Sequence, residues 1–172
     1  SIDINLQQSI KNNLIDTINF YKAESGLAIV LDITNGEILS SVSYPDFNPN
    51  NNKSFNEINL INRVIQSNYE MGSTFKPLTI VNGYDYGIIN PEMVFDVKKS
   101  VKGVKDHDKY KDNGLYDVEK IVVESSNIGT AQIALKIGKH NQKEFLDKLG
   151  FFKKIDIELF EAEEPLGNPN NW

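Results

Sequence analysis

The strongest constraint on the fold is a hairpin pattern near the start of the chain. Residues 27–31 form a short, wholly apolar run, and residues 37–44 form a second run that ends at Tyr44. Asn35-Gly36 between the two runs is typical of a tight turn, because both residue types tolerate a positive φ. The sequence therefore predicts an antiparallel β-hairpin over residues 26–44.

Helical patterns surround this hairpin. Apolar side chains recur at helical spacing over residues 4–22, and Glu24-Ser25-Gly26 ends the pattern. Further helices are expected from Gly72 to about Tyr84 and over residues 117–125, 127–138 and 141–149. We expect residues 45–57 and 96–114 to be loops, the second with short strand pieces. This order predicts an α+β fold, and a hairpin alone is a poor sheet, so more strands are expected than the chain offers.

Composition excludes several classes of function. The net charge of −6 argues against a nucleic-acid partner, because such proteins usually present a basic face. The chain has no Cys, which excludes thiol catalysis, disulfides and thiolate metal sites. No apolar run approaches the length of a membrane span, so any anchor is expected outside this chain. His107 between two Asp residues is a weak metal candidate, His140 is expected to be solvated, and we predict neither metal nor cofactor.

One pair of residues can carry nucleophilic chemistry. Ser73 and Lys76 stand three positions apart at the start of a predicted helix, so their side chains share a face. A serine hydroxyl needs a base to remove its proton, and lysine can be that base when burial and nearby positive charge lower its pKa. With twelve Ser and seventeen Lys, chance alone predicts about one Ser-x-x-Lys pair. By itself the pair fits an ordinary helix N-terminus better, with Ser73 as N-cap and Lys76 facing solvent.

A second motif follows at Ser125-Ser126-Asn127, between two predicted helices. A turn there can direct the Ser125 hydroxyl and the Asn127 amide into a cleft, where one relays a proton and the other holds a carbonyl or the lysine. The other interpretation is a helix N-cap at Ser125 or Ser126. A further Ser-x-Asn at Ser54 precedes Ser73 and lies in an Asn-rich loop, so we set it aside.

The two motifs, in this order, resemble those of penicillin-binding proteins. The resemblance to class B penicillin-binding proteins extends over nearly the whole chain, and Ser125-Ser126-Asn127 resembles their cell-division type more than their elongation type. It is carried in order by Leu27–Leu39, Tyr44-Pro45, Phe47–Asn50, Asn62-Arg63, Tyr69–Pro77, Asp106-His107 and Glu124–Thr130. The fold implied is a penicillin-binding/β-lactamase-like transpeptidase fold, of which residues 1–172 would be the front part.

The resemblance also implies roles for the motif residues. Ser73 would attack the penultimate D-alanine carbonyl of a peptidoglycan stem peptide, and its backbone N–H would supply half of the oxyanion hole. Lys76 would take the Ser73 proton, Ser125 would pass a proton to the leaving D-alanine, and Asn127 would position Lys76 and the substrate. Ser73, Ser125 and Asn127 would thus also bind the substrate.

Partners and location follow from the same resemblance. Substrates would be stem peptides on lipid-linked precursor strands, and β-lactams would acylate the same serine. The parent protein would work with cell-division proteins on the periplasmic side of the cytoplasmic membrane.

The chain departs from the family pattern in two places. Met71 stands where the family usually has Pro, and no Lys-Thr-Gly motif occurs. The Lys-x-Gly sequence from Lys136 to Gly138 falls within a predicted helix and cannot line a cleft as a strand. We therefore expect a truncated transpeptidase domain, weakly active or inactive by itself, whose exposed strand edge can pair with another copy. The alternatives are a class D-like β-lactamase, a β-lactam sensor domain and a non-catalytic scaffold.

Overall fold

The structure, a computed structural model, describes residues 2–106 and 113–167 and divides into two compact units. The first unit comprises the chain up to Asn68 together with Asp156–Glu163. The second comprises Tyr69–Ile155 and the residues from Glu164 onward. Each unit is built from its own helices and its own pair of strands.

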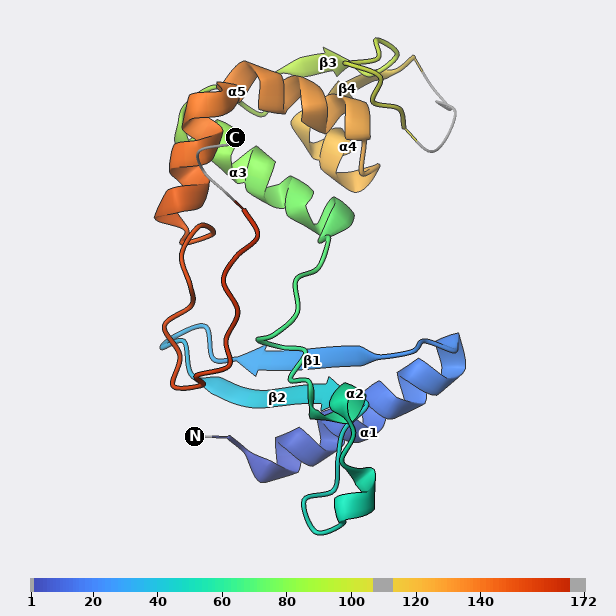
Figure 1. The fold of residues 1–172 in the computed structure, drawn as a ribbon. Coiled ribbons are helices and arrows are strands. Elements are labelled where there is room, and N and C mark those ends of the chain that lie inside the picture. The colour runs from blue at the N-terminus through green and yellow to red at the C-terminus, as the bar shows by residue number, and fades with distance from the viewer. Residues whose placement is uncertain (1, 107–112, 168–172) are drawn as a thin grey trace. The chain divides into compact units, whose positions relative to one another are not determined.

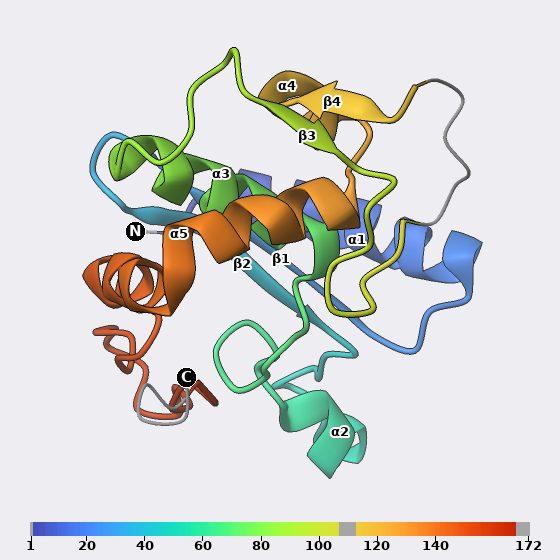
Figure 2. The same cartoon turned by 90° about the horizontal axis from the view of Figure 1, so that it is seen from above.

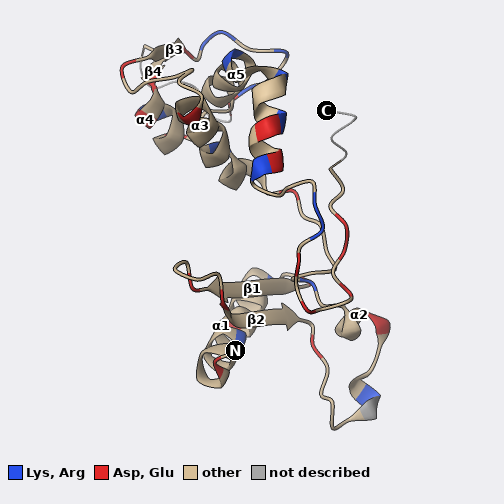
Figure 3. Ribbon diagram, turned by 90° about the vertical axis from the view of Figure 1, so that its left-hand side faces the viewer, with Lys and Arg blue, Asp and Glu red and all other residues tan. Residues whose placement is uncertain are grey.

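The first unit is a helix on a hairpin. Helix α1 (Ile4–Tyr21) begins at the N-cap Asp3, whose carboxylate accepts a hydrogen bond from the Leu6 amide at 2.9 Å. Strands β1 (Gly26–Leu31) and β2 (Ile38–Tyr44) pair antiparallel, with Gly26 opposite Tyr44, and α1 lies against them (Figure 1). Neither strand carries a charged residue, as the tan ribbons of Figure 3 show.

A polar clamp fixes α1 on this hairpin. The Gln7 amide oxygen accepts hydrogen bonds from the Ser40 hydroxyl and the Ser41 amide, both at 2.8 Å. The Gln7 amide nitrogen donates to the Ser41 carbonyl at 2.7 Å. Because Ser40 is completely buried, Gln7 satisfies polar groups that would otherwise lose water without replacement.

The rest of the first unit is held by the single arginine. A 3₁₀ turn (Asn52–Ser54) and the short helix α2 (Glu57–Leu60) follow the hairpin. Arg63 is 8% exposed, and its guanidinium donates to the carbonyls of Ile58, Ile61 and Pro45 at 3.1, 3.3 and 3.4 Å. These bonds tie the end of β2 to the segment that leads out of the unit.

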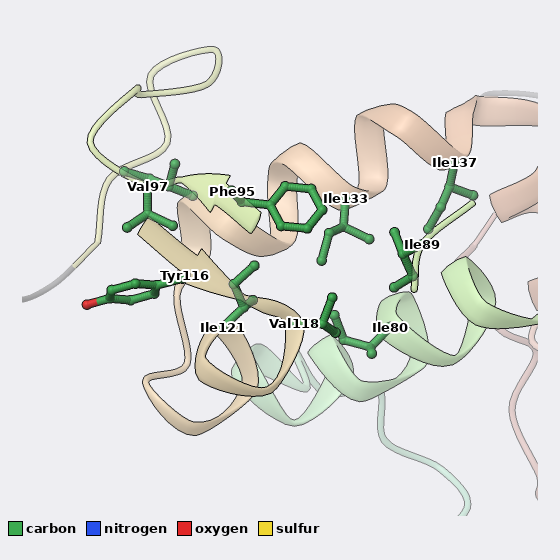
Figure 4. Packing of buried hydrophobic residues seen from close by; sticks show 10 residues of the cluster. Ile80, Ile89, Phe95, Val97, Tyr116, Val118, Ile121, Ile133 and Ile137 are labelled. Carbon is green, nitrogen blue, oxygen red and sulfur yellow. The ribbon is translucent and has the colours of Figure 1, made fainter. Parts of the chain in front are cut away.

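The second unit is mainly helical. It contains a 3₁₀ turn (Gly72–Phe75), α3 (Lys76–Asp85), β3 (Val94–Asp96), β4 (Leu115–Asp117), α4 (Val118–Val123) and α5 (Asn127–Lys148). Strands β3 and β4 pair antiparallel, and α3 lies beside α5 (Figure 2). One core joins all of these elements except the 3₁₀ turn (Figure 4): Ile80, Ile89, Phe95, Val97, Tyr116, Val118, Ile121, Ile128, Ile133 and Ile137.

The predicted elements largely agree with these bounds. The hairpin lies where Asn35-Gly36 placed it, and α1 ends one residue before the predicted limit. The helices predicted over 127–138 and 141–149 are joined in α5, which is interrupted at Gly138 (φ 79°, ψ 162°). The strand pieces expected within residues 96–114 instead lie at the two ends of this range, in β3 and β4. Over the described part of the chain, no helix combines the length and apolarity needed to cross a bilayer.

Candidate active site

Ser73 lies in the 3₁₀ turn that leads into α3, where its side chain is exposed. Gly72 before it has φ +57°, a left-handed conformation that residues with a Cβ rarely adopt. Pro77 occupies the first turn of α3, where a missing N–H costs nothing. The helix predicted to start at Gly72 is therefore α-helical only from Lys76, because the glycine bends the chain just before the serine.

Lys76 is the first residue of α3 and joins the two motifs. Its ammonium donates to the Ser125 hydroxyl at 2.9 Å and also to the Ser125 main-chain carbonyl. Since these residues are 49 positions apart in sequence, the contact depends on the packing of α3 against α4 and α5. The structure thus brings Ser125 to the lysine that lies one helical turn after Ser73.

Two opposing effects act on the pKa of Lys76. Burial lowers the pKa of the Lys76 ammonium below its usual value, and the negative charge of Asp106 opposes that shift. Burial and a nearby positive charge are the two causes that can lower the pKa of a lysine base. Burial is present, but the charged group that acts on Lys76 is a carboxylate.

Ser125 and Ser126 form the tight turn between α4 and α5. Ser125 has φ +49°, and its amide donates to the Val122 carbonyl at 3.1 Å. The Ser126 amide donates to the Ile121 carbonyl at 2.9 Å. A Cβ added at Gly129 would lie 2.6 Å from Ile121, so glycine is what lets the first turn of α5 approach α4 this closely.

Two residues outside the predicted catalytic set hold this turn. The Ser126 hydroxyl donates to Asp106 Oδ2 at 2.8 Å and accepts from the Gly129 amide at 2.9 Å. The Ile128 amide donates to Asp106 Oδ1, also at 2.9 Å. Ser126 is the N-cap of α5, one of the two positions that the sequence pattern offered for a cap. No local pattern in the sequence indicates a role for Asp106. The residue was named only as part of the Asp106-His107 segment that resembles the family.

Asn127 faces the loop before the undescribed segment. Its amide nitrogen donates to the Lys105 carbonyl at 2.9 Å, whereas the Lys76 ammonium donates to Ser125. The structure therefore brings Lys76 to Ser125, and Asn127 to the loop that contains Lys105 and Asp106. Ser73 stands one turn before Lys76.

The remaining candidates lie apart from these residues or outside the described residues. His107 lies outside the described residues. His140 is exposed on α5, 3.8 Å from a Glu144 carboxylate oxygen. Lys136 and Gly138 both lie within α5, as the sequence indicated. Across residues 2–106 and 113–167, no cluster of His, Cys, Asp or Glu could hold a metal ion.

A serine one turn before a lysine at the start of a helix, with that lysine bound to a second serine, is an arrangement that suits serine acyltransferase chemistry. Residues 26–172 match the family model of the penicillin binding protein transpeptidase domain, and the chain belongs to this family. It is 31% identical over its whole length to the probable peptidoglycan D,D-transpeptidase FtsI of Caulobacter vibrioides. It is 30% identical, over 92% of its length, to the peptidoglycan D,D-transpeptidase FtsI of Escherichia coli K12.

The chain spans 29% and 27% of the lengths of these two relatives. Solved structures give the same fold. A peptidoglycan glycosyltransferase from Burkholderia ambifaria matches 99% of the chain with a TM-score of 0.83 and 24% identity, over 51% of its own length. Pseudomonas aeruginosa PBP2 in complex with WCK 5153 matches 99% with a TM-score of 0.81 and 24% identity, over 41% of its own length. The predicted α+β transpeptidase fold is thereby confirmed.

Proposed function

We propose that this chain carries the acylation machinery of a serine-type peptidoglycan D,D-transpeptidase that is also a β-lactam target. The observation that carries the proposal is the 2.9 Å hydrogen bond from the Lys76 ammonium to the Ser125 hydroxyl. It connects the Ser-x-x-Lys and Ser-x-Asn motifs one turn from Ser73. The relatives named as peptidoglycan D,D-transpeptidases support the reaction class.

The first half of the reaction forms an acyl-enzyme. The Ser73 oxygen attacks the carbonyl carbon of the penultimate D-alanine while neutral Lys76 takes the hydroxyl proton. The C–N bond to the terminal D-alanine then breaks, and the leaving nitrogen receives a proton from Lys76 through the Ser125 hydroxyl. Burial, by lowering the pKa of Lys76, favours the neutral amine that this step requires.

The second half transfers the acyl group. An amine of a second stem peptide attacks the ester carbonyl, a new amide forms, and the Ser73 oxygen regains its proton. The backbone N–H of Ser73 donates to the oxygen of the tetrahedral intermediate in both halves. Asn127 binds the substrate, and a β-lactam acylates Ser73 by opening its own amide bond.

The wider setting is part of the same proposal. Residues 1–172 belong to one transpeptidase domain of the cell-division type, which acts on lipid-linked precursor strands with cell-division proteins. Its site would be the periplasmic face of the cytoplasmic membrane. The names of the Caulobacter vibrioides and Escherichia coli relatives support this choice of type.

The test is the intact mass after incubation with penicillin, measured for the 172-residue chain and for the longest natural protein that contains it. We expect a stable adduct on the longer protein, and none on its Ser73→Ala variant with an unchanged circular dichroism spectrum. An adduct that persists in Ser73→Ala, or no adduct on either folded wild-type protein, would overturn the proposal. Rapid turnover of penicillin would point to a β-lactamase instead.

A further inference from the structure

The carboxylate of Asp106 meets the start of α5 with both of its oxygens. Oδ2 accepts from the Ser126 hydroxyl at 2.8 Å, and Oδ1 accepts from the Ile128 amide at 2.9 Å. The preceding residue, Lys105, accepts from the Asn127 amide nitrogen through its carbonyl. Two consecutive loop residues thus bind three consecutive residues of the motif turn and helix start.

These bonds satisfy donors that the fold would otherwise leave without partners. The first amides of an α-helix have no acceptor within the helix. In α5 the Ile128 amide donates a hydrogen bond to Asp106, and the Gly129 amide donates one to the Ser126 hydroxyl. Ser126 is only 2% exposed, so water does not replace these bonds. A negative carboxylate is also favourable at the positive end of the helix dipole.

The same bonds fix the residue that meets the lysine. Ser125 stands directly before Ser126 and holds a left-handed conformation, φ +49°. A turn in this conformation persists only where its surroundings hold it. Asp106 holds it from the α5 side, while Lys76 contacts the Ser125 hydroxyl and carbonyl from the α3 side.

We propose that Asp106 is a positioning residue for acyl transfer: its carboxylate seats the Ser125–Asn127 turn so that the Ser125 hydroxyl meets the Lys76 ammonium. The catalytic part of this inference rests on the proposed function, whereas the positioning part concerns geometry alone. A neutral side chain could fill the same space, but it would neither accept both bonds nor place a negative charge near Lys76.

The charge of Asp106 gives the inference a second readout. Asp106 raises the pKa of Lys76 against the effect of burial, and it is the charged group that does so among the described residues. Lys105 and Glu124, the charged neighbours in sequence of Asp106 and Ser125, are exposed to solvent. Removing the Asp106 charge should therefore let Lys76 lose its proton at a lower pH.

The first experiment needs no activity. In the 172-residue chain, hydrogen exchange at Ile128 and Gly129 and the titration of Lys76, followed through ¹³C-labelled lysine, are compared for wild type, Asp106→Asn, Asp106→Glu and Glu119→Gln. The Asn variant is nearly isosteric and retains one acceptor. We expect at least about tenfold faster exchange at Ile128 in Asp106→Asn. Lys76 should then titrate at a lower pH, whereas in Asp106→Glu its titration should return toward the wild-type position.

Glu119→Gln is the matched control. Glu119 lies on α4 of the same unit, is exposed, and its replacement also removes one negative charge. We expect it to leave both the Ile128 exchange and the Lys76 titration at their wild-type values. If Asp106→Asn matches wild type in both readouts, or if the control changes them equally, Asp106 does not position the turn.

The second experiment measures acylation by penicillin on the longer natural protein as a function of pH. We expect Asp106→Asn to lower the acylation rate constant about 10- to 100-fold, because a misplaced turn loses the proton relay. The rise of the rate with pH should also move to lower pH, following Lys76. An unchanged rate and profile would overturn the catalytic part. Failure of the wild type to be acylated would count against the proposed function, while the exchange and titration would still decide the positioning.

Discussion

At the scale of single residues, Ser125 combines a strained backbone with the contact on which the site depends. A left-handed conformation costs a residue with a Cβ about 1–2 kcal/mol. Here the φ of +49° turns both the hydroxyl and the carbonyl of Ser125 toward Lys76. The two motifs and their order are visible in the sequence, but this conformation is not, because serine carries no local preference for it.

The strain at Ser125 can be separated from its chemistry by two substitutions. Ser125→Ala and Ser125→Gly both remove the hydroxyl that accepts from Lys76, but only glycine relaxes the left-handed backbone. We expect the free energy of unfolding of the Gly variant to be about 1 kcal/mol higher than that of the Ala variant. Urea titration followed by circular dichroism measures the difference. Equal stabilities would show that the turn relaxes without cost.

The base assignment at Lys76 gives a pH prediction. If Lys76 is the base, as proposed, its neutral amine is the active form, so the acylation rate should rise with pH through the pKa of Lys76. Because burial lowers that pKa, the midpoint of the rise should lie below the pH at which an ordinary lysine loses half of its protons. A rate that tracks an ordinary lysine would contradict this assignment.

Lys76→Arg is the matched variant for this prediction. Arginine keeps the positive charge and a long side chain, yet it does not lose its proton in the accessible range. We expect acylation to fall at least about 100-fold at every pH, with the thermal unfolding midpoint nearly unchanged. The measurement is the penicillin adduct formed with time, by intact mass.

At the scale of elements, α5 shows what periodicity can and cannot resolve. The sequence pattern breaks at Gly138, which is why two helices are predicted, and the backbone does leave the helical region there. The Gln142 amide nitrogen donates to the carbonyls of Ala134 and Gly138, at 2.8 and 3.2 Å. These two bonds satisfy carbonyl groups beside the break and connect the helical stretches on its two sides. A side-chain bridge of this kind leaves no periodic signal in the sequence.

The packing of α4 against α5 sets the distance between the motif turn and the core. Gly129→Ala would place a methyl group 2.6 Å from Ile121, a residue that is fully buried and cannot move into solvent. We expect a loss of about 1–3 kcal/mol in unfolding free energy, despite the better helix propensity of alanine. Urea titration at constant pH measures it.

Lys136→Ala on the same helix is the control for this packing prediction. Lys136 is exposed on α5, so its replacement by alanine changes propensity without crowding the core. We expect its stability to stay within about 0.5 kcal/mol of wild type. If Gly129→Ala were as stable as Lys136→Ala, the close approach of α4 and α5 would not be required.

At the scale of the whole molecule, residues distant in sequence are gathered into each unit by tertiary packing. Asp106 reaches Ser126 across 20 positions, and Lys76 reaches Ser125 across 49. The catalytic candidates could be named from the sequence because two short motifs and a family resemblance mark them. Asp106 could not be given a role, because its partners are defined only once α3, α4 and α5 have packed on one core.

The segment Asp156–Glu163 is a second long-range feature, since it returns to the first unit after the chain has built the second. Its Glu163 amide donates to the Ile65 carbonyl at 2.9 Å, and Ala162 is 4% exposed. No periodic pattern marks this acidic stretch in the sequence, because one buried alanine among charged residues carries none. The contacts predict that the first unit depends on this segment for stability.

Ala162→Asp tests that dependence by burying a carboxylate where only a methyl group lies. The charge has no partner built for it, so we expect the first unit to lose about 2 kcal/mol or more. Native-state hydrogen exchange reports this at the Val42 amide of β2, which should exchange at least roughly 30-fold faster. The Ile133 amide of α5 in the second unit should change less.

Glu158→Asp, an exposed change in the same segment, should leave both amides at wild-type rates. If the Val42 amide exchanged at the wild-type rate in Ala162→Asp, the segment Asp156–Glu163 would not contribute to the stability of the first unit.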